Sequence, residues 1–431
     1  MNRIIFAILL LYAMSCGSTA VAQKSRQATP SQRNIESLMT IDSISCIDFC
    51  ADTIIFNGAD WSPLFRSIGL LQDTAQVEQN VVSIVHIGDS HVQAGFFTEA
   101  MRIPMQMKWG NAGRGLITPL KISNTNEPFD YRFTSPGKWQ FNRCLGKQFS
   151  SSVGVSGILI EPVDSAIDIY IETMSRYGED VKFNRFKLLH APTDTFPQLK
   201  LVDEPEGLVV HSPVAGETCY SWDTLTNSVS LRGINSNLPS KAAIYGLTLE
   251  NSNSGIIVHA VGNNSATYDC YNRIDDYGKK LASLAPHLVI ISLGTNESVP
   301  SVFNREKLER EIDNLVQAVK SGNPNALLLL TTPADNKLRK TRRNKKGRRI
   351  AYYVENVNLL NVAETIKGYG VKNNIAVWDW YTISGGKGSC EIWIKENGMR
   401  KDHIHYTPKG YALQGNLLYQ SILNAYEQHI R

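Results

Sequence analysis

The sequence predicts an α/β fold, in which a sandwich with a mostly parallel sheet is interrupted by an inserted all-β domain. Two observations carry this prediction. Continuous apolar runs alternate with helical stretches in the second half of the chain, as parallel sheets require. Residues 116–250 instead offer short alternating runs beside polar turns, which is typical of an antiparallel sandwich.

The parallel strands are predicted from apolar runs of strand length, because strands buried on both faces read as continuous runs. The five runs are Val81–Ile87, Gly255–Val261, His287–Leu293, Ala326–Thr332 and Ile375–Trp380. The clearest helix is expected over Arg305–Ser321, before the stop signal Gly322-Asn323-Pro324. One face of this helix is apolar. That face consists of Leu308, Ile312, Leu315, Val316 and Val319.

The inserted domain is predicted from seven short runs with turn residues between or beside them. These runs are Phe129–Phe133, Gly157–Glu161, Ala166–Glu172, Phe186–His190, Gly207–His211, Ser228–Arg232 and Ala243–Leu249. Together the patterns divide the chain into an α/β domain at 41–115 and 251–431 and a β sandwich at 116–250.

The first 22 residues predict a signal peptide. Asn2-Arg3 is followed by the apolar run Ile4–Met14 and by the cleavage-like Ala20-Val21-Ala22. The apolar run is too short to span a bilayer, and no other stretch is apolar enough to do so. Lipidation at Cys16 is the alternative interpretation. Residues 23–40 are polar and predict a flexible leader. We therefore expect an exported protein, periplasmic or extracellular.

Charge and cysteine content narrow the function classes. The formal net charge of +4 over 431 residues does not point to nucleic acid. Removal of the signal peptide leaves six cysteines, which allow up to three disulfides in an exported protein. Cys46 and Cys50 have no second metal-like pair near them, so no structural zinc is expected there.

Three polar segments follow predicted strands, where the carboxyl ends of parallel strands form ligand sites. They are Gly88-Asp89-Ser90-His91, Gly262–Thr267 and Gly294–Glu297. A serine at a helix start sees unpaired backbone N–H groups and the positive helix end, which suit an oxyanion. Taken singly, each segment is equally well an ordinary helix cap, turn or polar loop.

A fourth segment near the C-terminus supplies an acid-base pair. Asp402 and His405 are three residues apart, so the carboxylate can orient the imidazole. The alternatives are a charged surface loop and a metal site formed by Asp402, His403 and His405. No further cluster of carboxylates and histidines supports a metal.

Together these four segments resemble the four blocks of the SGNH/GDSL hydrolases. The resemblance spans about 80–115 and 250–431, and it implies a three-layer α/β/α sandwich and no cofactor or metal. It also implies that Ser90 is the nucleophile and that Asp402 and His405 are its partners. The implied oxyanion donors are the N–H of Ser90, a backbone N–H of Gly262 or Ser265, and the Asn296 amide. The chain departs from the family pattern at three positions, with histidine at 91 for the usual leucine, serine at 265 where many members have glycine, and glutamate at 297 for a frequent aspartate.

The long insertion is similar to that of periplasmic peptidoglycan O-acetylesterases, which carry a carbohydrate-binding-like β domain there. This resemblance implies a serine esterase that removes O-acetyl groups from an acetylated polysaccharide. A lipid esterase, a thioesterase and a glycan O-acetyltransferase would use the same triad. The non-enzyme alternative is a glycan-binding surface protein, against which the intact residues Ser90, Asn296, Asp402 and His405 argue.

The most basic stretch runs from 337 to 349, just after the predicted strand that ends at Thr332. Its simplest interpretation is a solvated loop. The functional alternative is attraction of an anionic polymer, such as peptidoglycan or an acidic glycan, to a site that the stretch borders.

Overall fold

The computed structural model describes residue 38 and residues 43–72, 79–193, 196–234 and 242–431. The expected signal peptide at 1–22, Cys16 and all of the 23–40 leader except residue 38 lie outside these described residues. Among the described residues, no helix is long and apolar enough to cross a membrane.

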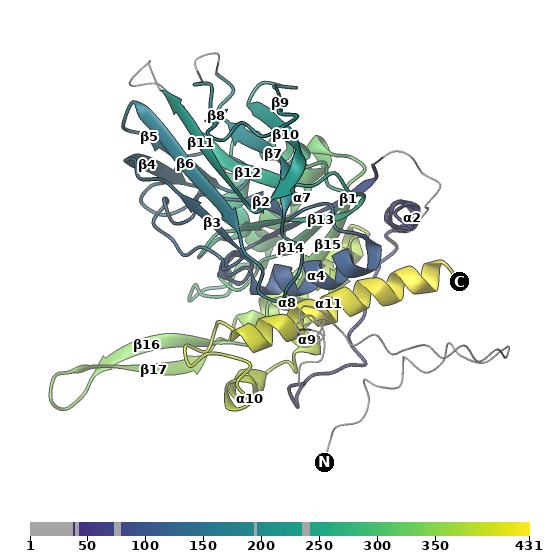
Figure 1. The fold of residues 1–431 in the computed structure, drawn as a ribbon. Helices are drawn as coiled ribbons and strands as arrows, with labels where there is room; N and C mark the ends of the chain where they lie inside the picture. Colours follow the sequence, from purple (N-terminus) through teal and green to yellow (C-terminus); the bar gives the residue numbers. More distant parts are fainter. Residues whose placement is uncertain (1–37, 39–42, 73–78, 194–195, 235–241) are drawn as a thin grey trace, which may run out of the picture.

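A five-stranded parallel sheet forms the centre of the α/β part (Figure 1). Its strands lie in the order β13 (Gly255–Gly262), β1 (Val81–Gly88), β14 (Leu288–Ser292), β15 (Leu327–Thr331) and β18 (Ala376–Trp378). Each falls on a predicted run. The last run ends two residues early, because Asp379 caps the short helix α9 (Trp380–Ile383) by accepting a hydrogen bond from Thr382 N–H.

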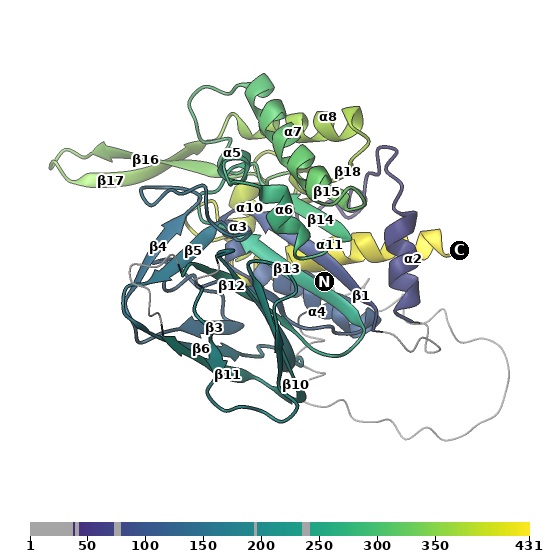
Figure 2. The same ribbon diagram turned by 90° about the horizontal axis from the view of Figure 1, so that it is seen from above.

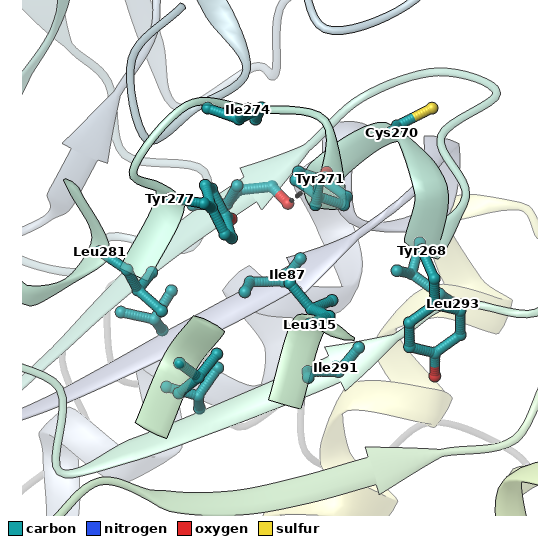
Figure 3. Close-up of a cluster of buried hydrophobic side chains, with 14 of the residues drawn as sticks. Ile87, Tyr268, Cys270, Tyr271, Ile274, Tyr277, Leu281, Ile291, Leu293 and Leu315 are labelled. Atoms are coloured by element: carbon teal, nitrogen blue, oxygen red, sulfur yellow. Dashed lines mark hydrogen bonds between the residues drawn. The ribbon is translucent and has the colours of Figure 1, made fainter. Parts of the chain in front are cut away.

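Helices cover both faces of this sheet. Successive strand residues point to opposite faces, and apolar residues on both faces are buried against helices. Val85 and Ile87 belong to a core shared with α5 (Tyr268–Asn272), α6 (Tyr277–Ala282), α7 (Arg305–Gly322) and α8 (Leu359–Lys372). Ile84 belongs to the opposite core, with α2 (Ser62–Leu70), α4 (Phe96–Trp109) and α11 (Pro408–His429). Figure 3 shows part of the first core, where Tyr268 and Tyr271 lie near Ile87 and Ile291. The layers α/β/α are therefore present.

Helix α7 forms where the sequence predicts it. Asn304 caps its start by accepting a hydrogen bond from Lys307 N–H, and all five residues of the predicted apolar face are buried.

Between β1 and β13 the chain builds two antiparallel sheets. The larger contains β4 (Trp139–Arg143), β5 (Ile158–Pro162), β12 (Ile244–Glu250), β7 (Phe183–His190), β10 (Glu217–Thr226) and β9 (Val209–His211), in that order, with β2 (Gly115–Ile117) paired to β12. The smaller contains β3 (Tyr131–Thr134), β6 (Ala166–Thr173), β11 (Ser228–Ile234) and β8 (Lys200–Leu201). One core holds buried residues from both sheets, including Phe133 and Ile169 from the smaller and Phe186 and Leu247 from the larger. The predicted fold class, a mostly parallel α/β part with an inserted β sandwich, is confirmed.

Two remaining features differ from the simplest expectation. The basic stretch is not a loop but a two-stranded hairpin of β16 (Lys337–Arg343) and β17 (Arg349–Glu355), which projects from the body in both ribbon views (Figures 1 and 2). The six cysteines among the described residues are free thiols rather than disulfides. Helix α10 (Ser389–Lys395) completes the fold.

Candidate active site

The first candidate segment lies at the point where the sheet reverses its strand order. Numbered along the chain, the five parallel strands have the spatial order 2-1-3-4-5, so the reversal falls between β1 and β14. In open α/β sheets this crevice outside the carboxyl ends of the strands is the preferred ligand site. Ser90 follows β1 and Asn296 follows β14, so the fold places both residues at this crevice.

Ser90 is the first residue of α3 (Ser90–Gln93), and the preceding Asp89 caps that helix by accepting from His91 N–H at 2.9 Å. Gly88 is needed because a side chain would not fit there, and not because the backbone adopts an unusual conformation. A Cβ at Gly88 would lie 2.3 Å from a Val92 methyl carbon and 2.9 Å from the Ser292 carbonyl oxygen. Strand and helix therefore meet too closely for any larger residue, and the helix start is held at the end of β1.

Ser90, His405 and Asp402 form one continuous chain of hydrogen bonds. The Ser90 Oγ lies 3.0 Å from His405 Nε2, and His405 Nδ1 lies 2.9 Å from Asp402 Oδ2. The Ser90 and His405 side chains come from opposite ends of the described sequence, yet they meet at hydrogen-bonding distance. This arrangement of hydroxyl, imidazole and carboxylate matches the geometry of serine hydrolase triads.

Asp402 also holds the loop that carries it. Its Oδ1 accepts hydrogen bonds from the backbone N–H groups of Ile404 and His405, both at 3.0 Å. Partial burial raises the pKa of Asp402, but the hydrogen bonds from the His405 side chain and from these two N–H groups outweigh it, so the pKa lies below its usual range. The carboxylate therefore stays ionised beside His405 through the neutral pH range.

His403, the neighbouring histidine, contacts Tyr353 and Glu391 rather than Ser90. Its ring stacks on Tyr353 at 3.9 Å between centroids, and its Nε2 lies 3.5 Å from a Glu391 oxygen. Among the described residues, no group of three potential ligands that could hold a metal is present. The alternative of a metal bound jointly by Asp402, His403 and His405 is therefore not supported by the geometry.

Asn296 reaches the site but is already engaged. Its Nδ2 donates to the Ala266 carbonyl at 2.9 Å and to Asp89 Oδ2 at 3.3 Å. The amide thus bridges the second segment and the residue before Ser90. Donation to an additional oxygen requires it to release the longer of these two bonds, the one to Asp89.

In the second segment, Gly262–Thr267, the structure distinguishes Gly262 from Ser265, the two alternative backbone donors to the oxyanion. A Cβ at Gly262 would lie 2.2 Å from the Gln93 backbone nitrogen, so Gly262 lets β13 pass close beneath α3. Ser265 instead has a left-handed φ of 69°, a conformation that favours glycine. The N–H groups of Asn263, Asn264 and Ala266 are bonded to Gly88 O, Gln93 Oε1 and Asn263 O. Within the described part of the chain, the N–H groups of Ser265 and Ser90 make no hydrogen bond.

The sequence reasoning did not assign roles to two polar residues on α3. The His91 Nδ1 shares a hydrogen bond of 3.0 Å with the Tyr411 hydroxyl, and its ring lies 5.5 Å from that of His405. Burial lowers the pKa of His91, so it packs against His405 as a neutral ring. Gln93 donates to the Thr125 hydroxyl and accepts from Asn264 N–H, which links the insertion to the second segment. The adjacency of both residues to Ser90 was the only signal available in sequence.

Glu297 ties the third segment, Gly294–Glu297, to the start of α5. One of its carboxylate oxygens accepts from Tyr268 N–H at 2.8 Å. Partial burial of the side chain disfavours its charged form and raises its pKa to about 8. Because the raised pKa favours the neutral carboxyl, Glu297 holds the Asn296 loop without adding a negative charge next to the site.

Comparison with known proteins agrees with this geometry. Residues 224–418 match the GDSL-like Lipase/Acylhydrolase family, a span that contains Gly262, Ser265, Asn296, Asp402 and His405 but not Ser90. This match, over less than half of the chain, identifies a GDSL/SGNH lipase-acylhydrolase domain and supports an ester hydrolase. The comparison with curated proteins gives no match.

The solved structures add the architecture of the whole chain. A structure described as "Peptidoglycan O-acetylesterase in action, 5 min" is 21% identical and has a TM-score of 0.70, covering 87% of this chain and 99% of its own. It shares the fold, including the strands between β1 and β13. A lipase/acylhydrolase from Enterococcus faecalis is 18% identical with a TM-score of 0.28, covering 40% of this chain and 78% of its own.

Proposed function

We propose that this protein is an exported serine esterase that removes O-acetyl or other short acyl groups from a polysaccharide, peptidoglycan or a related glycan. The hydrogen-bond chain from Ser90 through His405 to Asp402 is the single observation that carries the proposal. The structure with the same fold is described as a peptidoglycan O-acetylesterase, which supports an acetyl ester and a glycan as the substrate. The apolar run and cleavage-like site at residues 1–22 support export.

The proposed reaction begins when His405 Nε2 takes the proton of Ser90 Oγ as that oxygen attacks the ester carbonyl. Asp402 holds His405 in the tautomer whose Nε2 is free to accept, and it stabilises the imidazolium that forms. The imidazolium then protonates the departing sugar hydroxyl, which leaves an acyl group on Ser90. Water, deprotonated by His405, releases the acid and restores the serine.

The oxyanion formed in each step needs donors aimed at one point. We assign this role to the N–H groups of Ser90 and Ser265, because both lack a partner among the described residues. The Asn296 amide is the third donor, after it exchanges its 3.3 Å bond to Asp89 for the oxyanion. We assign Gly262 to close packing beneath α3 rather than to donation.

The direct test measures acetate release from O-acetylated peptidoglycan and from acetylated xylan, beside hydrolysis of p-nitrophenyl acetate. We expect acetate release by the wild type and near-complete loss of all three activities in Ser90→Ala. A Ser90→Ala variant that keeps more than about a tenth of the activity contradicts the assignment, since loss of a triad nucleophile costs far more. Acyl transfer to a glycan acceptor in place of acetate release indicates a transferase, and a preference for long acyl esters indicates a lipid esterase.

A further inference from the structure

The basic arm, which we define as residues 337–355, concentrates positive charge in one projecting element. It contains a single carboxylate, Glu355, against nine cations. The cations are Lys337, Arg339, Lys340, Arg342, Arg343, Lys345, Lys346, Arg348 and Arg349. The whole chain has a net charge of only +4, so the rest of the protein is net negative. The charge is a property of the arm and not of the general composition.

The outer cations of the arm have no counter-charge within the protein. The eight from Arg339 to Arg349 are all exposed, and no carboxylate of the described residues forms an ion pair with any of them. Arg343 lies directly opposite Arg349 in the β16–β17 register, where like charges destabilise a strand pair. A two-stranded hairpin outside a larger sheet is only marginally stable in water. An anionic partner lying along the arm would remove this repulsion.

The base of the arm is fastened to the loop that carries the candidate triad. Lys337 N–H donates to the His403 carbonyl at 3.1 Å, and the Tyr353 ring stacks on the His403 ring. The Lys337 ammonium and His403 both pair with Glu391. Since His403 lies between Asp402 and His405 in sequence, the arm begins beside the loop of the candidate triad, and Figure 1 shows β16 and β17 projecting from the body.

One face of the arm carries both the tyrosine that stacks on His403 and three of the nine cations. Residues directly opposite each other in an antiparallel pair lie on the same face, and the faces alternate along each strand. Tyr353 is paired with Arg339, and Arg343 with Arg349. These four side chains therefore share one face, with Tyr353 and Arg339 near the site and Arg343 and Arg349 about 13 Å further out, four residues at roughly 3.3 Å each.

We propose that the basic arm is a docking element for an anionic polysaccharide that carries acyl esters, and that a chain bound along it is delivered to Ser90. This proposal rests on the proposed esterase function and names the charge that its substrate carries. Carboxylate-bearing glycans, such as uronic acid polymers or peptidoglycan strands, provide both the ester for the site and the negative charge for the arm. Nucleic acid provides charge without an acyl ester.

The tip of the arm argues against a lipid surface as its partner. The connecting turn is Asn344-Lys345-Lys346-Gly347-Arg348, without an apolar side chain. Interfacial binding elements bury apolar side chains between the lipid headgroups in addition to their charge. The arm therefore has the composition of an electrostatic track for a polymer in solution.

The first experiment measures binding apart from catalysis. Full-length Ser90→Ala is titrated with polygalacturonate at low and at physiological salt, with and without Arg339→Gln, Arg343→Gln and Arg349→Gln combined. We expect the triple variant to bind about ten-fold more weakly at low salt, from three exposed charge contacts of modest strength each. Its affinity should also depend less on salt, because fewer ions are displaced.

A matched control removes the same charge elsewhere, through Lys279→Gln, Arg305→Gln and Lys372→Gln, all exposed on helices. This control should bind polygalacturonate within two-fold of its parent. Equal weakening by the two triple variants overturns the proposal, because net charge alone would then explain binding. Tighter binding of duplex DNA or of phosphatidylglycerol vesicles than of polygalacturonate, at equal charge concentration, also overturns it.

The second experiment separates docking from catalysis in the otherwise wild-type chain. On acetylated polygalacturonate, the arm variant should raise KM about ten-fold with kcat retained, while kcat/KM on p-nitrophenyl acetate changes less than two-fold. Equal losses on both substrates contradict docking. If the wild type hydrolyses neither substrate, the esterase proposal fails, whereas the binding result with Ser90→Ala still decides whether the arm holds an anionic glycan.

Discussion

Replacement of Asp402 by asparagine separates the two tasks that we propose for its carboxylate, which are holding the loop and orienting His405. The asparagine Oδ1 can still accept from the N–H groups of Ile404 and His405, so both 3.0 Å bonds that shape the loop are retained. The other oxygen becomes an NH₂ group facing His405 Nδ1, where the carboxylate accepted at 2.9 Å. The imidazole must then accept at Nδ1 and carry its proton on Nε2, the atom that faces Ser90.

In that tautomer His405 cannot take the proton of Ser90. Loss of the correct tautomer in a serine triad lowers kcat by about 10⁴-fold. Because Asp402 is partly exposed and water can replace some of its effect, we expect a loss of about 10³- to 10⁴-fold, or about 4 to 5.5 kcal/mol of transition-state stabilisation. The melting temperature should change little, since the loop bonds persist.

The assay compares kcat/KM for p-nitrophenyl acetate and acetate release from an acetylated glycan, with thermal unfolding followed by circular dichroism. Asp402→Asn that retains activity within ten-fold of the wild type refutes the assigned role of Asp402. An equally large loss accompanied by a large drop in melting temperature would instead mean that the variant disturbs the loop, and that the carboxylate's role is structural.

Three further outcomes are expected from neighbouring residues. Asn296→Ala should lower kcat about 100- to 1000-fold, as loss of an oxyanion donor does. Ser265→Ala keeps its backbone N–H, so its kcat should stay within about ten-fold of the wild type. Equal losses in the two variants would contradict the assignment of a side-chain donor at 296 and a backbone donor at 265. His405→Ala should abolish acetate release while His403→Ala remains active, and the reverse order would reassign the base. Glu297, whose pKa rises to about 8 when folded, holds a proton that the unfolded chain loses above pH about 4.5, so its contribution to stability falls as pH rises between these values. Between pH 5 and pH 8, the melting temperature of Glu297→Gln should therefore fall less than that of the wild type. Identical falls of the two melting temperatures in scanning calorimetry would show that Glu297 is ionised in the folded protein.

The parallel sheet was predictable because burial on both faces leaves a direct mark on sequence. A strand such as β14 consists mostly of buried apolar residues, here Leu288–Ile291, and the run over His287–Leu293 shows this without knowledge of its neighbours. The strand β10 lacks such a mark. It alternates only briefly, around Tyr220 and Trp222, and its outer half is exposed. Its pairing with β7 joins residues distant in sequence, such as Glu217 and Leu189.

The same distinction applies to the site. Ser90, Asp402 and His405 belong to short segments of recognisable chemistry, so their types and order predicted a common function. Gly262 was open to two interpretations because its role depends on the Gln93 backbone, which approaches from another element. The hairpin β16–β17 was interpreted as a loop because charged residues fill β16 and the connecting turn. Only the cross-strand register reveals that Tyr353 and three arginines share a face.

The most direct test of the mechanism is to locate the covalent intermediate. The purified full-length protein is inactivated with a fluorophosphonate, and the modified peptide is identified by mass spectrometry. We predict a single phosphonate on Ser90, at one per active molecule, with labelling strongly slowed in Asp402→Asn and His405→Ala. Complete loss of esterase activity with Ser90 unmodified, or with the label on another residue, would contradict the central claim that Ser90 is the nucleophile.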